Sequence, residues 1–131
     1  INNTDAFQET SHFAEGSMLY IKIISQEVVD KNHVGDDWLN STKIEDEYYY
    51  EGDRIKINLS KKSEVIITSI GLEEDPNHDD IGYYELIITP KNIDALLKKS
   101  PITEIVRVQE HHGRGAGISA ECKFVYTLSA E

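Results

Sequence analysis

Residues 66–82 read IITSIGLEEDPNHDDIG, and this stretch decides the architecture of the chain. It opens on an apolar, β-prone run, passes through a dense acidic segment, and closes on Ile-Gly, which leads into a second β-prone run at residues 83–89. Five of the eight residues from Glu73 to Asp80 are acidic. The pattern predicts two strands joined by an acidic loop, because β-branched runs bounded by turn residues are typical of strands.

Strand-like alternation continues along the rest of the chain. Apolar side chains occupy every second position in residues 19–24 and 54–60, and most regularly in residues 120–128. Residues 102–110 also have a strand pattern, in which Val106 and Val108 share a face. Such period-two patterns predict strands that bury one face. The largely apolar run Val65–Ile70 predicts a more fully buried strand.

Only one segment has helical periodicity. Ile93, Leu96 and Leu97 share a face in residues 92–99, and Ser100-Pro101 ends that pattern. Strands otherwise alternate with turns and not with helices. We therefore predict an all-β fold, an antiparallel β-sandwich of seven or eight strands with one short helix near residues 92–99.

The length of 131 residues fits one domain with a substantial core. Residues 1–17 are polar and irregular, and we expect an N-terminal arm or a leader left from cloning there, with the β-sandwich domain at residues 18–131. No apolar run approaches the roughly 20 residues that cross a bilayer, and no basic-then-apolar signal peptide is present. We expect a soluble protein, whose compartment and oligomeric state the sequence leaves open.

The formal net charge of −11 limits the kinds of partner that the chain can bind. It disfavours binding to nucleic acid and unaided binding to an anionic membrane, because both need a basic surface. It suits a cation or a basic protein partner. Cys122 is the single cysteine, so no internal disulfide can form, and we expect it to fill the core within a strand.

A second acidic segment follows the first predicted strand, and residues 30–38 read DKNHVGDDW. It begins like a helix-loop-helix calcium loop, but Val34 stands where an oxygen ligand belongs and Ser41 where the bidentate Glu should be. Its flanks also have strand patterns, so we reject that motif. We expect Trp38, the only Trp, to anchor this loop at the edge of the core.

The two acidic segments together predict a metal site. Loops at one end of a sandwich can converge, so carboxylates far apart in sequence can share one cation. Side-chain oxygens alone favour calcium over zinc. The predicted ligands are Asp30, Asp36, Asp37, Glu73, Asp75, Asp79 and Asp80.

This arrangement resembles the C2 domain, a calcium-dependent β-sandwich module. In that family a first loop carries two Asp residues six apart, and a later loop carries Asp-x-Asp and a further Asp just before the Ile-Gly that begins the next strand. Asp30 and Asp36 match the first pair, residues 73–75 match Asp-x-Asp with Glu in first place, and residues 79–82 match the closing motif. The resemblance covers residues 19–89. It implies calcium binding by these acids, with membrane contact only when calcium is bound.

Two other functions remain open from the sequence. No nucleophile elbow, metalloprotease helix or Cys–His pair is present, and we expect a non-catalytic module. An acidic immunity or inhibitor protein that binds a basic protein without metal would need only the negative charge and a compact fold. The aromatic triplet Tyr48–Tyr50 would suit a carbohydrate platform. We expect the adjacent His111 and His112 to be surface residues.

Overall fold

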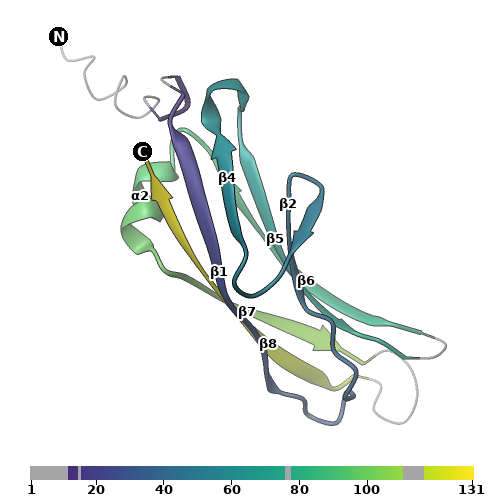
Figure 1. Ribbon diagram of the computed structural model, residues 1–131. Coiled ribbons are helices and arrows are strands. Elements are labelled where there is room, and N and C mark those ends of the chain that lie inside the picture. Colours follow the sequence, from purple (N-terminus) through teal and green to yellow (C-terminus); the bar gives the residue numbers. More distant parts are fainter. Residues whose placement is uncertain (1–11, 15, 76–77, 111–116) are drawn as a thin grey trace.

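The computed structural model describes residues 12–14, 16–75, 78–110 and 117–131, which form two four-stranded antiparallel sheets (Figure 1). The first sheet has the order β4-β1-β8-β7, and the second has the order β3-β2-β5-β6. The strands are β1 (Met18–Asp30), β2 (Ser41–Ile44), β3 (Glu47–Tyr49), β4 (Arg54–Asn58), β5 (Val65–Glu73), β6 (Asp80–Ile88), β7 (Ile102–Gln109) and β8 (Ser119–Ala130). The predicted all-β sandwich is confirmed.

Short helical segments accompany the sheets. The helix α2 (Ile93–Lys99) connects β6 to β7 across the two sheets, where the sequence predicts a helix. A 3-10 turn, η1 (Leu59–Lys61), follows β4 and buries Leu59, so this strand is shorter than its apolar alternation predicts. His111 and His112 lie outside the described residues, as does most of the predicted N-terminal arm.

The core lies between the sheets and follows the alternation of the sequence. Every second residue of β8 from Ala120 to Leu128 is buried, and Cys122 lies among them as predicted. The larger part of the core joins both sheets and takes in Phe13 from the segment before β1. A smaller part, nearer the acidic segments, consists of Val106, Val108, Cys122 and Phe124, with Val28 and Trp38 against it.

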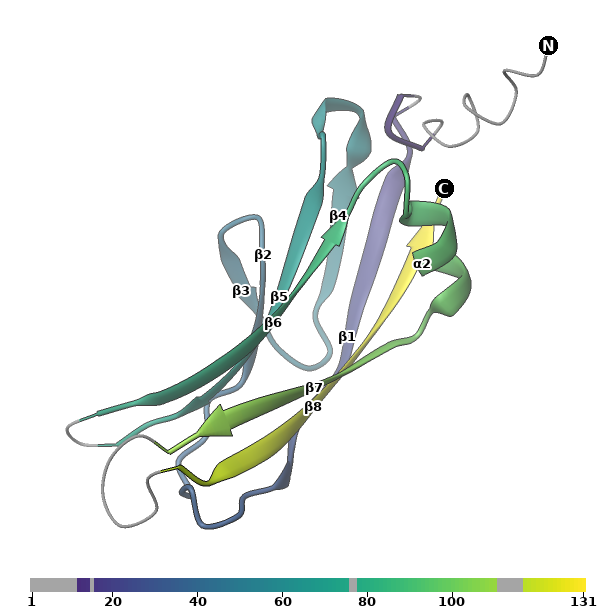
Figure 2. The same ribbon diagram turned by 180° about the vertical axis from the view of Figure 1, so that it is seen from behind.

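The prediction of a more fully buried strand at Val65–Ile70 is wrong. Residues along β5 alternate between buried and more exposed positions, and Ile66 is exposed. The inner face packs on the first sheet. Among the described residues, the outer face is covered by no further layer of secondary structure, so its apolar side chains remain at the surface (Figures 1 and 2).

The strands β5 and β6 extend further into the acidic segment than the sequence predicts. Their pairing continues through Gly71–Gly82 and Leu72–Ile81 to Glu73–Asp80, so Glu73 and Asp80 are strand residues and not loop residues. At this end, opposite α2, the β5–β6 hairpin lies beside the ends of β7 and β8 (Figure 2). A Cβ on Gly82 would clash with the carbonyl oxygen of Arg107 in β7. The absence of a side chain at residue 82 therefore lets the two sheets approach closely beside the acidic residues.

Candidate cation site

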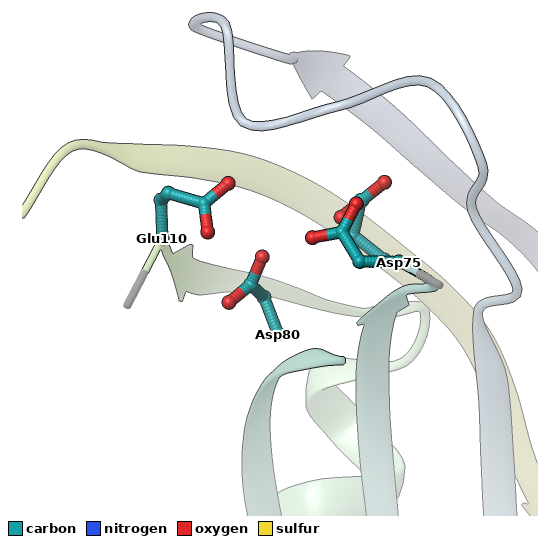
Figure 3. Close-up of side chains that lie close together, drawn as sticks. Asp75, Asp80 and Glu110 are labelled. Carbon is teal, nitrogen blue, oxygen red and sulfur yellow. The ribbon is translucent and has the colours of Figure 1, made fainter. Parts of the chain in front are cut away.

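Four carboxylates gather where β5, β6 and β7 meet at this end of the sandwich. They belong to Glu73, Asp75, Asp80 and Glu110, and we call them the acidic cluster. One oxygen of each residue lies within 4.8 Å of the corresponding oxygens of the other three. Figure 3 shows Asp75, Asp80 and Glu110 with their carboxylates around a shared space. Both sheets contribute, because Glu110 follows β7 while the other three belong to the β5–β6 hairpin.

Backbone register accounts for these positions. Glu73 and Asp80 are directly opposite each other in the antiparallel pair and point to the same, inner face. Glu110 continues the inward alternation of Val106 and Val108. Its backbone is fixed by two hydrogen bonds across the β7–β8 connection, one donated by Glu110 N to the Ile118 carbonyl at 2.8 Å and one accepted from Gly117 N at 2.7 Å.

The acidic cluster is largely withdrawn from water. Glu73 is 2% exposed, Asp80 0% and Glu110 8%, and Asp75 is half-buried. Burial raises the pKa of Glu73 to about 7, with further contributions from the charge of Asp75, a hydrogen bond with Asp75 and the charge of Asp80. A hydrogen bond from the backbone of Asp37 acts in the opposite direction. Ionising this carboxyl is therefore costly unless a positive charge enters the cluster.

Oxygen Oε1 of Glu73 marks where such a charge would be bound. It is a buried atom, and it has no hydrogen-bond partner among the described residues. Buried polar atoms are rarely left unsatisfied, because each costs about 1–3 kcal/mol. The side chain has little room to turn away, since a Cβ on Gly35 would clash with the Glu73 carboxylate.

The segment between β1 and β2 encloses the acidic cluster from a second side. Trp38 forms an isolated bridge with Glu73, Glu74 N donates to the Asp37 carbonyl at 2.7 Å, and Leu39 N donates to the Leu72 carbonyl at 2.8 Å. Both acidic segments therefore lie at the same end of the sandwich. Trp38 anchors the loop as predicted, since its Nε1 donates to the Gly35 carbonyl at 2.8 Å and its ring packs on the smaller core.

The remaining predicted ligands lie around the acidic cluster and not in it. Asp36 and Asp37 line an open acidic hollow beside Trp38, together with Glu74 and Asp75. Asp36 is highly exposed and forms an ion pair with Lys31 at 2.9 Å.

Asp30 and Asp79 are engaged in local backbone contacts. Oδ1 of Asp30 accepts from Asn32 N at 3.0 Å, and Oδ1 of Asp79 accepts from Asp75 N at 3.2 Å. Of the seven predicted ligands, the structure thus brings together Glu73, Asp75 and Asp80.

Sequence reasoning missed Glu110 as a member. The signal was present, because Glu110 falls on the inward positions of an alternating strand after Val106 and Val108. A carboxylate at the inner end of such a strand must be buried or lie at the mouth of the sandwich. Only the packing of the two sheets against each other shows that the Glu110 carboxylate lies close to Asp80.

A buried carboxyl outside the acidic cluster has different surroundings. Glu104, on the inner face of β7, accepts a hydrogen bond from Ser69 Oγ at 2.6 Å and another from the Tyr126 hydroxyl at 2.8 Å. Both carboxyl oxygens therefore have donors. Burial raises the pKa of Glu104, and these two hydrogen bonds oppose the rise.

The acidic cluster provides only oxygen donors. Carboxylate oxygens from four residues, completed by water or backbone carbonyls, are the coordination that calcium accepts, with 6–8 oxygens as a rule. The cluster has no imidazole or thiolate, which zinc sites usually include. The chemistry of the donor set therefore agrees with the predicted preference for a hard cation.

Comparison with known proteins gives no family for this chain: no protein-family model matches it, and no curated protein does. Across the described residues, no helix combines the length and the apolar character needed to span a membrane.

Proposed function

We propose that this protein is a non-catalytic, calcium-binding β-sandwich module whose site is the acidic cluster. One observation supports this most strongly: the Glu73 carboxylate has a buried oxygen, Oε1, without a hydrogen-bond partner among the described residues, and one oxygen of this carboxylate lies within 4.8 Å of oxygens from three other carboxylates. A divalent cation would supply the missing partner and offset the mutual repulsion of the carboxylates.

Calcium at this position would join the two sheets. It would tie the β5–β6 hairpin to the end of β7, and through Glu73 it would also stabilise the segment that carries Asp37 and Trp38. The proposed consequence is an ordered loop end that presents a surface to a protein partner or, only with calcium bound, to a lipid surface. The resemblance of residues 73–82 to the second acidic motif of the C2 domain supports the same function.

Calcium titration by calorimetry tests the proposal. We expect the wild type to bind calcium, and Glu73→Gln to lose at least about tenfold in affinity, because the buried oxygen no longer carries charge. Two variants serve as matched controls. Glu104→Gln alters a buried carboxyl outside the acidic cluster, and Asp30→Asn alters a predicted ligand outside the acidic cluster, so both should bind as the wild type does.

Trp38 gives an independent signal from the native chain. Its indole lies in the segment that touches Glu73, so we expect its fluorescence to change on calcium addition and to recover with chelator. An absence of binding heat together with unchanged fluorescence at millimolar calcium would rule the proposal out. Equal losses in Glu73→Gln and Asp30→Asn would move the site away from the acidic cluster.

A further inference from the structure

The outer face of the β5–β6 hairpin carries an apolar stripe. Three cross-strand pairs point outward along it, namely Ile66–Ile87, Ile70–Tyr83 and Leu72–Ile81. Tyr83 is 68% exposed and Ile81 is 55% exposed. Large apolar side chains scattered singly over a surface need no explanation, but paired rows along two neighbouring strands are typical of interaction sites.

An acidic groove interrupts this stripe at the outward pair Thr68–Glu85. Its volume is about 330 Å³. Its lining is acidic apart from Lys43, Ile66 and Thr68, and the carboxylates belong to Glu45, Asp46, Glu64 and Glu85. The groove and the stripe share Ile66, so they form one continuous surface, which we call the outer patch.

Lysines already occupy part of the groove. Nζ of Lys62 lies 3.0 Å from Oε2 of Glu45, and Nζ of Lys43 lies 3.9 Å from Oδ1 of Asp46. Glu64 and Glu85 form no ion pair with any described residue, and both are exposed. Two carboxylates on either side of Ile66 and Thr68 are thus available to a cation from outside the molecule.

We propose that the outer patch binds a basic amphipathic segment of a protein partner. Lys or Arg side chains of that segment would lie between Glu64 and Glu85, and its apolar side chains would cover Ile66, Ile87 and Tyr83. Charge complementarity selects this occupant, because the groove is acidic and the whole chain carries −11. A second copy of the same chain would bring like charge to the groove.

The outer patch is separate from the acidic cluster. It uses the outward residues of β5 and β6, whereas Glu73 and Asp80 point to the inner face of the same strands. Binding of the basic segment therefore needs no calcium. Failure of one proposal leaves the other standing, because peptide binding is measured in chelator and calcium binding is measured without the peptide.

The experiment uses isotope-labelled protein, chelator, and a capped peptide that repeats Lys-Thr-Val-Thr, so that an extended chain carries Lys and Val on one face. We expect backbone amide shifts at Ile66, Thr68, Glu85 and Ile87. The double variant Glu64→Gln, Glu85→Gln should bind about tenfold more weakly, and Ile87→Thr should also weaken binding.

Matched controls separate the outer patch from general attraction. Glu27→Gln with Glu131→Gln removes the same charge elsewhere, and Ile24→Thr removes an isoleucine of similar exposure, 44% against 40% for Ile87. Unchanged affinity in these controls supports the proposal. It is overturned by an absence of binding, by equal weakening in both charge variants, or by a wild-type dimer that Ile87→Thr dissociates.

Discussion

Glu104 and Glu73 are two carboxyl groups on inner faces of the same sandwich, and their surroundings are opposite. Glu104 is 7% exposed and receives hydrogen bonds from two hydroxyls that are themselves buried. Glu73 is 2% exposed and faces other carboxylates, with one oxygen unsatisfied among the described residues. Burial raises the pKa of both groups.

The comparison distinguishes a carboxyl that stabilises the fold from one that needs a bound proton or cation. A buried carboxyl with donors on both oxygens completes a polar network and stabilises a unique packing. A buried carboxyl among like charges destabilises the fold unless a proton or a cation compensates it. Glu104 is therefore expected to matter for stability at every calcium concentration, and Glu73 to matter through what binds it.

The largest expected effect is the loss of the Glu104 network. Glu104→Ala would leave Ser69 Oγ and the Tyr126 hydroxyl buried without an acceptor, and we expect a loss of about 3 to 4 kcal/mol in the free energy of unfolding. Denaturant unfolding with and without calcium measures it. Glu104→Gln retains one acceptor oxygen and should lose less. A loss that calcium reverses would contradict the structural role of Glu104.

The next effect is a pH dependence that Glu73 imposes when calcium is absent. Its pKa is about 7 in the folded protein against 4.5 as the ordinary value, so the folded state holds a proton that the unfolded state has released. Stability should therefore fall as pH rises from about 4.5 through about 7, by up to about 3 kcal/mol.

Glu73→Gln provides the control for this pH dependence, since it cannot ionise. The difference between wild type and variant isolates the contribution of Glu73 in unfolding measurements across this pH range. With calcium bound the trend should weaken or reverse, because the cation favours the ionised form. The stability of the wild type could instead rise over this pH interval in chelator, relative to the variant. That result would show that the neighbours of Glu73 do not raise its pKa.

A smaller effect concerns the close approach of the sheets. Gly82→Ala would place a methyl group against the Arg107 carbonyl and push β6 from β7, at a cost of about 2 kcal/mol. Asp80 and Glu110 would separate, so calcium affinity should fall as well. Gly52→Ala is the control: it strains a residue with φ of 91° away from the site, and calcium binding should not change. Unaltered calcium affinity in Gly82→Ala would contradict the proposed geometry.

The sequence was sufficient for the fold because alternation is a local signal. The buried positions of β8 could be read directly from the apolar residues between Ala120 and Leu128. The outer face of β5 could not, because an apolar run shows that a strand can be buried and not whether another layer covers it. Ile66 shows this, because it belongs to the apolar run and yet is exposed.

The candidate site was only partly predictable. Glu73, Asp75 and Asp80 stand close in sequence, so their clustering follows from one hairpin. Glu110 comes from the other sheet, and its approach depends on Gly82 lying against Arg107, which is a tertiary contact. Asp30 and Asp36 were predicted from their acidic segment and from the resemblance to the C2 domain, but the structure leaves both outside the cluster, Asp30 in an Asx turn and Asp36 in an ion pair with Lys31.

The most direct test compares how calcium binding depends on Glu73 and on Glu104. Free energies of unfolding are measured for wild type, Glu73→Gln and Glu104→Gln, each in chelator and in saturating calcium. We expect calcium at a hundredfold excess over the wild-type dissociation constant to stabilise the wild type and Glu104→Gln alike, by about 2.7 kcal/mol, and Glu73→Gln by no more than about 1.4 kcal/mol. Equal stabilisation of all three proteins, or of none, would contradict the assignment of Glu73 as a cation ligand.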